Sequence, residues 1–337
     1  MRSGFEMLRF AAPAFCLLLA ACGGGGSSAP APPPTPPPAP PPPSGSVTIS
    51  GAITYDFVPV DTITNGLNYA ATTQRPARNV AVEAANSGGT VLASGLTDAA
   101  GAYSLTVPAG TVVRIQARSR MQGPGGLFDF TVRDNTSSNA VYLLTGGLLD
   151  SGGANSTRNL NAPSGWGGAS YTGTRAAAPF ALLDTILTSI ETVNAVAPGT
   201  SFETAQVFWS VNNRAASGSV ANGEIGSTSY TRISGVPTIL VQGSANNDTD
   251  EYDRHVIAHE FGHYLEDTQS RNDSIGGPHS LSQRLDPRLA FSEGWSNAFS
   301  GIALGDPVYR DSNGAAQSTG FRFNVESNTF SASGWYG

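Results

Sequence analysis

The pattern of hydrophobic and polar positions changes along the chain, from strict alternation to helical spacing. Between residues 46 and 147, apolar side chains recur at every second position, as at Tyr103, Leu105 and Val107, and turn residues separate the runs. A period of two is typical of half-buried β-strands. About seven short strands in roughly 100 residues predict an all-β sandwich over 46–147.

From about residue 176 the spacing of apolar positions becomes helical. They recur at steps of three and four along one segment, at Phe180, Leu183, Leu187, Ile190 and Val193. This period predicts an amphipathic helix that ends before Pro198-Gly199. Two strands and a second helix are expected next, over 205–211, 237–242 and about 249–267.

A third helix is expected to carry Glu293 near its start. Helices mixed with strands predict an α+β domain over 176–337. A connection rich in Gly, Ser and Asn, over 148–175, joins it to the β-sandwich. Residues 331–337 show no closing helix or strand, as expected of a domain that is incomplete at its C-terminus.

The N-terminal residues 1–21 are expected to be a signal peptide. Two arginines precede an apolar run over 10–21, which is shorter than the ~20 residues that a membrane-spanning helix needs. The run ends at Cys22, preceded by Leu-Ala-Ala, and resembles the lipobox of bacterial lipoproteins. The resemblance implies a lipid anchor on Cys22 in the bacterial cell envelope, with Gly23 favouring the outer membrane. An ordinary secretory signal is the alternative.

Residues 22–45 form a low-complexity stretch, in which eleven of the 23 prolines lie between positions 30 and 43. Proline tracts favour an extended backbone, so this stretch predicts a spacer that reaches roughly 40 Å. The only cysteines are Cys16 and Cys22. The exported chain is therefore expected to have no disulfide, and to depend on its core or on metal for stability.

Composition excludes several classes of function. All 18 cationic residues are arginines, so there is no lysine for a Schiff base and none for a phosphate-binding loop of the P-loop kind. The formal net charge is −7, which argues against a nucleic-acid partner.

The residues that carry chemistry gather in one short segment. All four histidines lie between positions 255 and 279, and two of them belong to His259-Glu260-Phe261-Gly262-His263. Residues four apart lie on the same face of a helix, so both imidazoles can bind one Zn²⁺. Glu260 is rotated away from that face and can reach a water on the metal.

A catalytic zinc needs a third protein ligand. The HExxHxxGxxH pattern fails, because Glu266 and Gln269 stand where glycine and histidine are required. His279 lies in a polar loop, and Glu293 lies on the next expected helix, with Asn297 one turn further on the same face. Glu293 is the favoured third ligand, and His279 is the alternative.

This constellation resembles the gluzincin metallopeptidases, which include thermolysin-like enzymes. The resemblance implies that His259, His263 and Glu293 are ligands of one Zn²⁺ and that Glu260 is the general base. Asn297 stands where thermolysin-like members have an aspartate that orients the first histidine. The resemblance covers about 248–300 well and the rest weakly.

Other features of that family have candidate counterparts here. The strand Thr238-Ile239-Leu240-Val241 resembles the edge strand that pairs with an extended peptide substrate. Tyr309 and Tyr336 are candidates for stabilising the oxyanion. A Ca²⁺ site near the acidic start of the second helix, around Asp250, is an idea that no pattern in the sequence supports.

In the first region, the turn Thr97-Asp98 followed by Gly101-x-Tyr103-x-Leu105 resembles the carboxypeptidase-regulatory-like, or transthyretin-like, module. The resemblance implies a module of a kind that is usually non-catalytic. The sequence therefore predicts a lipid-anchored zinc endopeptidase that hydrolyses a peptide or protein substrate, with a β module between spacer and enzyme. The alternative is a non-catalytic binding or structural lipoprotein with a structural or degenerate zinc site.

Overall fold

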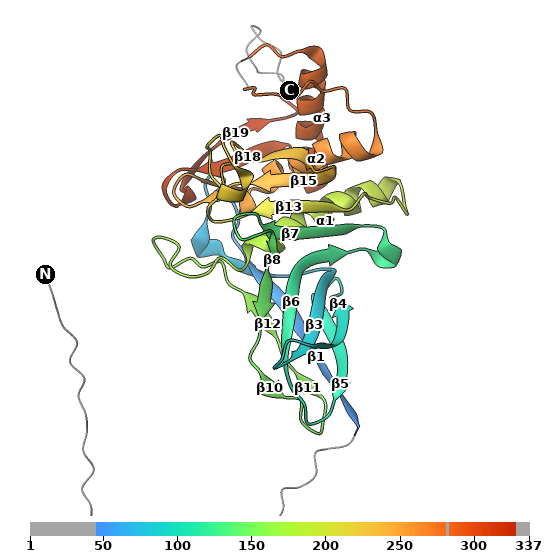
Figure 1. Cartoon of the computed structure of the whole chain (residues 1–337). Coiled ribbons are helices and arrows are strands. Elements are labelled where there is room, and N and C mark those ends of the chain that lie inside the picture. Colours follow the sequence, from blue (N-terminus) through green and yellow to red (C-terminus); the bar gives the residue numbers. More distant parts are fainter. Residues whose placement is uncertain (1–44, 281–282, 328–337) are drawn as a thin grey trace, which may run out of the picture. The chain divides into compact units, whose positions relative to one another are not determined.

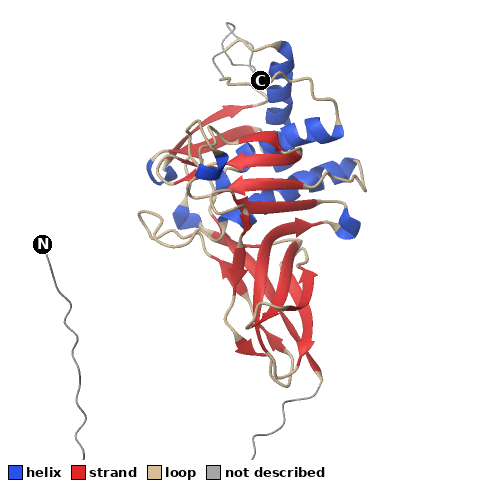
Figure 2. Cartoon of the chain, in the orientation of Figure 1, coloured by secondary structure: helices blue, strands red, loops and turns tan. Residues whose placement is uncertain are grey.

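The computed structural model describes residues 45–280 and 283–327. The expected signal peptide, Cys22, most of the proline-rich stretch and Tyr336 lie outside these residues. The described part is rich in β-structure, with nineteen strands and three α-helices (Figure 2). The prediction of a β-rich fold is thus confirmed. No helix in the described ranges is both long enough and apolar enough to cross a membrane.

A five-stranded sheet is built around the long N-terminal strand β1 (Ser46–Phe57). Strand β1 runs antiparallel to β5 (Ala102–Pro108) and β2 (Thr73–Pro76). It runs parallel to β11 (Ser156–Thr157) and β12 (Leu160–Ala162). The alternating residues of β5 behave as predicted, because Tyr103, Leu105 and Val107 are buried while their neighbours are not.

A larger sheet of ten strands occupies the middle of Figure 1. Its main path is β14 (Ser229–Ile233), β15 (Val236–Val241), β13 (Ala205–Trp209), β7 (Asp129–Asp134), β6 (Val112–Gln122), β3 (Val80–Asn86) and β4 (Val91–Leu96). Short strands pair beside β6 and β7: β8 (Ala140–Val141), β9 (Leu143–Thr145) and β10 (Leu149–Asp150).

This sheet crosses the expected boundary between the β-sandwich and the α+β domain. Strand β7 precedes residue 148, yet it pairs in parallel with β13 of the second region. Strands from 46–147 are divided between the two sheets, and one core cluster takes residues from both regions. A self-contained immunoglobulin-like or transthyretin-like sandwich is therefore not confirmed.

The three expected helices are present: α1 (Ala178–Val196), α2 (Arg254–Gln269) and α3 (Pro287–Leu304). The predicted apolar face of α1 is buried, and the helix packs against α2, β6 and β7. Helix α2 begins five residues later than predicted. Residues Asp248–Thr249 form strand β17 with β16 (Gly243–Ser244), and Asp250–Tyr252 form a 3₁₀ turn.

A last hairpin, β18 (Val308–Asn313) with β19 (Thr319–Asn324), follows α3.

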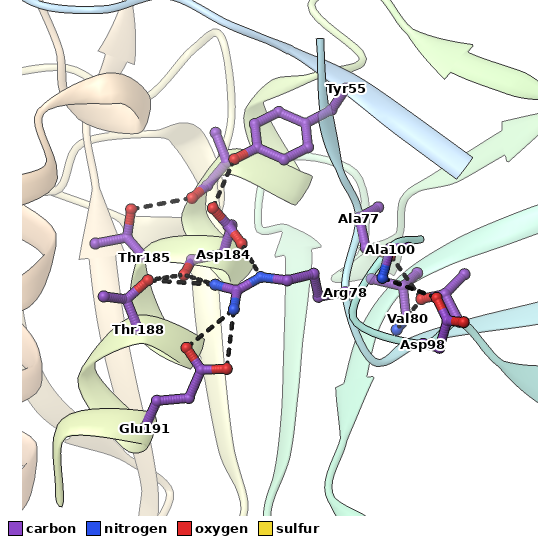
Figure 3. Close-up of polar contacts among 12 residues, drawn as sticks. Tyr55, Ala77, Arg78, Val80, Asp98, Ala100, Asp184, Thr185, Thr188 and Glu191 are labelled. Carbon is purple, nitrogen blue, oxygen red and sulfur yellow. Dashed lines mark hydrogen bonds and ion pairs between the residues drawn. The ribbon is translucent and has the colours of Figure 1, made fainter. Parts of the chain in front are cut away.

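Within the same compact unit, Arg78 links the segment before β3 to α1. Its Nε donates to Asp184 Oδ1 over 2.7 Å, and its Nη1 donates to both carboxylate oxygens of Glu191 over 2.9 Å (Figure 3). Asp184 also accepts the hydroxyl of Tyr55 from β1 over 2.8 Å.

Candidate functional site

Helix α2 places the two histidines of the HExxH motif together. Its core-facing side chains, Ile257, Phe261 and Tyr264, are fully buried, which fixes how the helix is rotated. His259 and His263 lie one turn apart on another face, with their Nε2 atoms 3.0 Å from each other. Both imidazoles therefore point at one location.

Helix α3 brings Glu293 to the same location. The helix begins after Asp286, which accepts the Arg288 amide, and Pro287 occupies its first turn. Glu293 Oε2 lies 3.2 Å from His259 Nε2, and Oε1 lies 3.4 Å from His263 Nε2. The three residues form a group in which one ligand atom from each lies within 4.8 Å of the others, so they could hold a metal ion.

Close packing of α2 on α3 sets this geometry. The indole Nε1 of Trp295 donates to the carbonyl of Gly262 over 3.0 Å. A Cβ on Gly262 would lie only 2.8 Å from Ser296 Cα, so the glycine of the motif is required by the helix contact itself. The approach of Glu293 to the two histidines thus depends on a small residue in the facing helix.

The outer nitrogen of each ring is held by α3. Asn297 Oδ1 lies 2.9 Å from His259 Nδ1, as predicted from its position one turn after Glu293. The hydroxyls of Ser292 and Ser296 each lie 3.1 Å from His263 Nδ1. An Nδ1–H that donates to these acceptors leaves the Nε2 lone pair free for a metal.

Glu266, which the sequence did not point to, is the next residue in this chain of contacts. The Ser292 hydroxyl donates to Glu266, a buried carboxylate on α2. The hydroxyl can therefore accept from His263 while its own proton goes to Glu266. The signal was available, since Glu266 lies three residues after His263 on the same helix.

His279 also reaches the site, although it is not part of the three-residue group. Its Nε2 lies 3.2 Å from Glu293 Oε2, and its Nδ1 lies 3.0 Å from the carbonyl of Gly277. Glu293 was favoured over His279 as the third ligand, yet the polar loop brings the His279 ring to the carboxylate of Glu293. His279 remains the most exposed of the histidines around Glu293.

The histidines act on Glu293 electrostatically. Burial alone raises the pKa of this carboxyl, but hydrogen bonds with His259, His263 and His279 lower it far below its usual value. The bond with Glu293 is also the main cause that raises the pKa of His279, to about 9. Without a bound cation, Glu293 is therefore ionised and surrounded by nitrogen groups.

Glu260 faces open space beside these residues. It lines a cavity of about 900 Å³ together with His259, His263 and Glu293. A smaller cavity, of about 220 Å³, lies on another side of His259 and Glu293, and Tyr309 lines it. Tyr309, one of the two tyrosines named as candidates from the sequence, thus lies beside the site, with its ring centroid 6.1 Å from that of His259.

The strand expected to pair with substrate is not at the sheet edge. Thr238, Ile239, Leu240 and Val241 belong to β15, which is paired with β13 on one side and β14 on the other. Because β15 is hydrogen-bonded to a strand on each side, it has no free edge with which a substrate peptide could pair. The strand at that end of the described sheet is β14, and its residues Ser229, Tyr230 and Thr231 line the 900 Å³ cavity.

Comparisons with known proteins give one family match. Residues 224–336, about a third of the chain, match the mycolysin C-terminal domain. No curated protein matches the chain. This family match includes every residue of the site described above, and it supports a peptidase-associated protein.

Two solved structures with weak similarity are a 9R-lipoxygenase from Cyanothece PCC8801 and the major plantain pollen allergen Pla l 1. The first has 12% identity and a TM-score of 0.19, over 45% of this chain and 24% of its own. The second has 12% identity and a TM-score of 0.18, over 35% of this chain and 94% of its own. This chain thus spans about a quarter of the lipoxygenase, and similarity so low carries no argument.

Proposed function

We propose that this protein is a zinc-dependent peptidase in which His259, His263 and Glu293 hold the metal and Glu260 is the general base. The observation that carries the proposal is the convergence of those three side chains beside Glu260 and an open cavity. A purely structural zinc site has no use for a glutamate next to the first histidine.

The donor set suits zinc. Two imidazole nitrogens and one carboxylate are three protein ligands, the number typical of catalytic zinc, which keeps a further position for water or substrate. Two Nε2 lone pairs 3.0 Å apart repel each other unless a proton or a cation lies between them. The acceptors at both Nδ1 atoms favour the cation, because they keep the protons on the outer nitrogens.

A zinc ion held by His259, His263 and Glu293 would supply a Lewis acid at the scissile carbonyl and at the attacking water. The chain supplies the proton transfers. Glu260, on the cavity wall, accepts the proton of the attacking water and later delivers it to the leaving amine. Tyr309 and His279, which both line the smaller cavity, are the candidates for donating to the developing oxyanion.

An extended peptide is the substrate that the surroundings fit. Strand β14 ends the described sheet and borders the cavity, so its free edge can pair with a substrate backbone. This replaces the role that the sequence assigned to β15. The lipid anchor at Cys22 and the outer-membrane location remain part of the proposal. The division into a β module and a zincin-like α+β domain does not, because the ten-stranded sheet joins the two regions.

The test is a comparison of Glu260→Gln with the wild-type protein. The variant should keep one equivalent of zinc by elemental analysis and lose peptide hydrolysis by about 10²-fold or more, because only the base has been removed. Glu326→Gln, far along the chain from the motif, is the matched control and should hydrolyse peptide like the wild type.

The competing function is a non-catalytic binding protein with a structural zinc site. It predicts that wild-type protein binds zinc tightly yet cleaves nothing in a broad peptide library. That result, obtained with zinc-loaded protein, would refute the peptidase.

A further inference from the structure

Glu266 is a buried acidic residue to which the proposed reaction gives no role. Its side chain is 6% exposed, and it lies in the last turn of α2, which ends at Gln269. The negative end of the helix dipole makes this a poor position for a carboxylate, and burial removes the water that would stabilise its charge. The next residue, Asp267, is in the same turn but is offset by Arg232, whose Nε lies 2.6 Å from its Oδ2.

Glu266 has no such cationic partner. Within residues 45–280 and 283–327 no arginine pairs with it, and its nearest ring nitrogen is His263 Nδ1, 3.9 Å from Glu266 Oε2. That distance is too long for a direct hydrogen bond. The hydroxyl of Ser292 bridges the gap, because it donates to Glu266 Oε2 and lies 3.1 Å from His263 Nδ1.

The bridging hydroxyl has a defined direction. A carboxylate only accepts hydrogen bonds, so the Ser292 proton points at Glu266 and the oxygen of Ser292 is left to accept from the Nδ1–H of His263. A proton on Nδ1 leaves the lone pair on Nε2, the atom that faces His259 and Glu293. Hydrogen bonds to an ionised acceptor are the stronger ones, and successive bonds in a chain polarise one another. The negative charge of Glu266 therefore makes His263 a better donor at Nε2.

Two other groups that hold the rings lack this feature. Asn297 Oδ1, 2.9 Å from His259 Nδ1, belongs to a neutral amide. The hydroxyl of Ser296 lies 3.1 Å from His263 Nδ1, as far as that of Ser292, but it contacts no carboxylate in the described ranges. Ser292 is thus the group through which a buried negative charge reaches the outer nitrogen of a ring.

We propose that Glu266 is a positioning residue for the metal, which acts through Ser292 to orient the ring of His263 and to strengthen its Nε2 as a ligand. This inference rests on the proposed function, because it takes His263 to be a zinc ligand. A cation held at the Nε2 atoms would also offset the burial of the Glu266 charge, which explains an acid at a position that otherwise disfavours one.

The test is a double-mutant cycle in the full chain, stripped of metal and titrated with zinc in competition with a chromophoric chelator. Glu266→Gln keeps the shape of the side chain and removes its charge, so zinc should bind about tenfold more weakly. Ser292→Ala should cause a similar loss. Because both substitutions break one chain of contacts, the double variant should bind zinc about as weakly as Ser292→Ala alone, whereas independent effects would multiply to about 100-fold.

Ser296→Ala is the matched control, because it removes a hydroxyl at the same distance from the same nitrogen. It should weaken zinc binding less than Ser292→Ala does. Folding is checked without metal, where the Tm of Glu266→Gln should be at least that of the wild type, because a buried charge at the helix end is gone.

Nuclear magnetic resonance of the zinc-loaded protein gives a readout that a merely structural role would not move. The Nδ1 proton of His263 should shift upfield in Glu266→Gln, because its hydrogen bond is weaker, while the Nδ1 proton of His259 stays in place.

The outcomes separate this inference from the function on which it rests. A wild-type protein that binds no zinc would refute both. If the wild type binds zinc, then equal affinity in Glu266→Gln, a multiplicative loss in the double variant, or an unchanged His263 signal would refute the role of Glu266 alone and leave the peptidase in place.

Discussion

At the scale of single residues, the rings of His259 and His263 are held by neutral groups. Asn297 accepts from His259 and two serine hydroxyls contact His263, while the nearest carboxylate behind them, Glu266, acts through Ser292. A neutral acceptor fixes the tautomer of a ring but adds less basicity than a carboxylate does. The strength of metal binding at this site is therefore open to adjustment by single substitutions.

Asn297 gives the most direct test of this reasoning. Asn297→Ala removes the acceptor at His259 Nδ1 and should weaken zinc binding by about tenfold or more. Asn297→Asp keeps an acceptor at His259 Nδ1 and adds a negative charge, so this variant should bind zinc at least as tightly as the wild type. Competition with a chromophoric chelator measures both. Equal zinc affinity in the alanine variant would show that Asn297 does not position the ring.

Tyr309 and His279 can be separated by kinetics. If Tyr309 donates to the oxyanion, Tyr309→Phe should lower kcat by about 10²-fold with little change in KM, because that bond forms only in the transition state. His279→Gln should then have a much smaller effect on kcat. The opposite ranking of the two variants, at unchanged zinc content, would assign the donor role to His279 instead.

The residues of the metal group were predictable because they obey local rules. His259, Glu260 and His263 follow from helical spacing, and Glu293 follows from the next helix and its distance along the chain. His279 was underestimated because loop geometry depends on long-range contacts that a single sequence does not contain. The Ser292–Glu266 contact joins two helices and was hidden for the same reason.

At the scale of elements, the existence and type of the helices were easier to predict than their ends or their neighbours. Helix α2 starts at Arg254 because Asp248–Thr249 pairs with β16, a contact that outweighs the helical pattern there. Strand β15 was predicted as a strand, yet its place between β13 and β14 depends on tertiary pairing. Sheet order is non-local, so periodicity alone could not show which strand is the edge.

The close packing of α2 on α3 can be tested by adding one methyl group at Gly262. Gly262→Ala places a Cβ against the backbone of Ser296, which cannot move without shifting α3, so we expect about 1–3 kcal/mol of destabilisation and loss of zinc binding. Gly301→Ala on α3 is the matched control, because its Cβ would first meet a side-chain methyl of Val325, at 3.2 Å, and no backbone atom closer than 3.4 Å. Chemical denaturation and zinc analysis measure both variants.

Helix propensity favours alanine over glycine by about 1 kcal/mol, so the control variant should be neutral or slightly more stable. Similar stability and zinc content in both variants would mean that the two helices can separate without cost to the site. In that case Gly262 would not be needed for the approach of Glu293.

At the scale of the whole described unit, the region expected to be a separate module is continuous with the region that carries the site. Strand β7 supplies one neighbour of β13, and the core cluster contains residues of β1 as well as of α1 and α2. The Arg78 network adds a polar link from the segment before β3 to Asp184 and Glu191 on α1 (Figure 3). Sequence composition suggested a boundary because the period changes there, but a change of period does not end a sheet.

This continuity predicts that the region carrying the His–His–Glu group cannot fold alone. A chain of residues 176–327 would expose the edge of β13 that β7 covers and the face of α1 that packs on β6 and β7. We therefore expect this fragment to be unfolded, as measured by circular dichroism, and to bind less than one equivalent of zinc. A chain of residues 45–327 should instead unfold in one transition, with the same midpoint by far-ultraviolet signal and by tryptophan fluorescence. A cooperative, zinc-binding 176–327 fragment would show that the predicted domain boundary is real, because its stability would then owe nothing to β7.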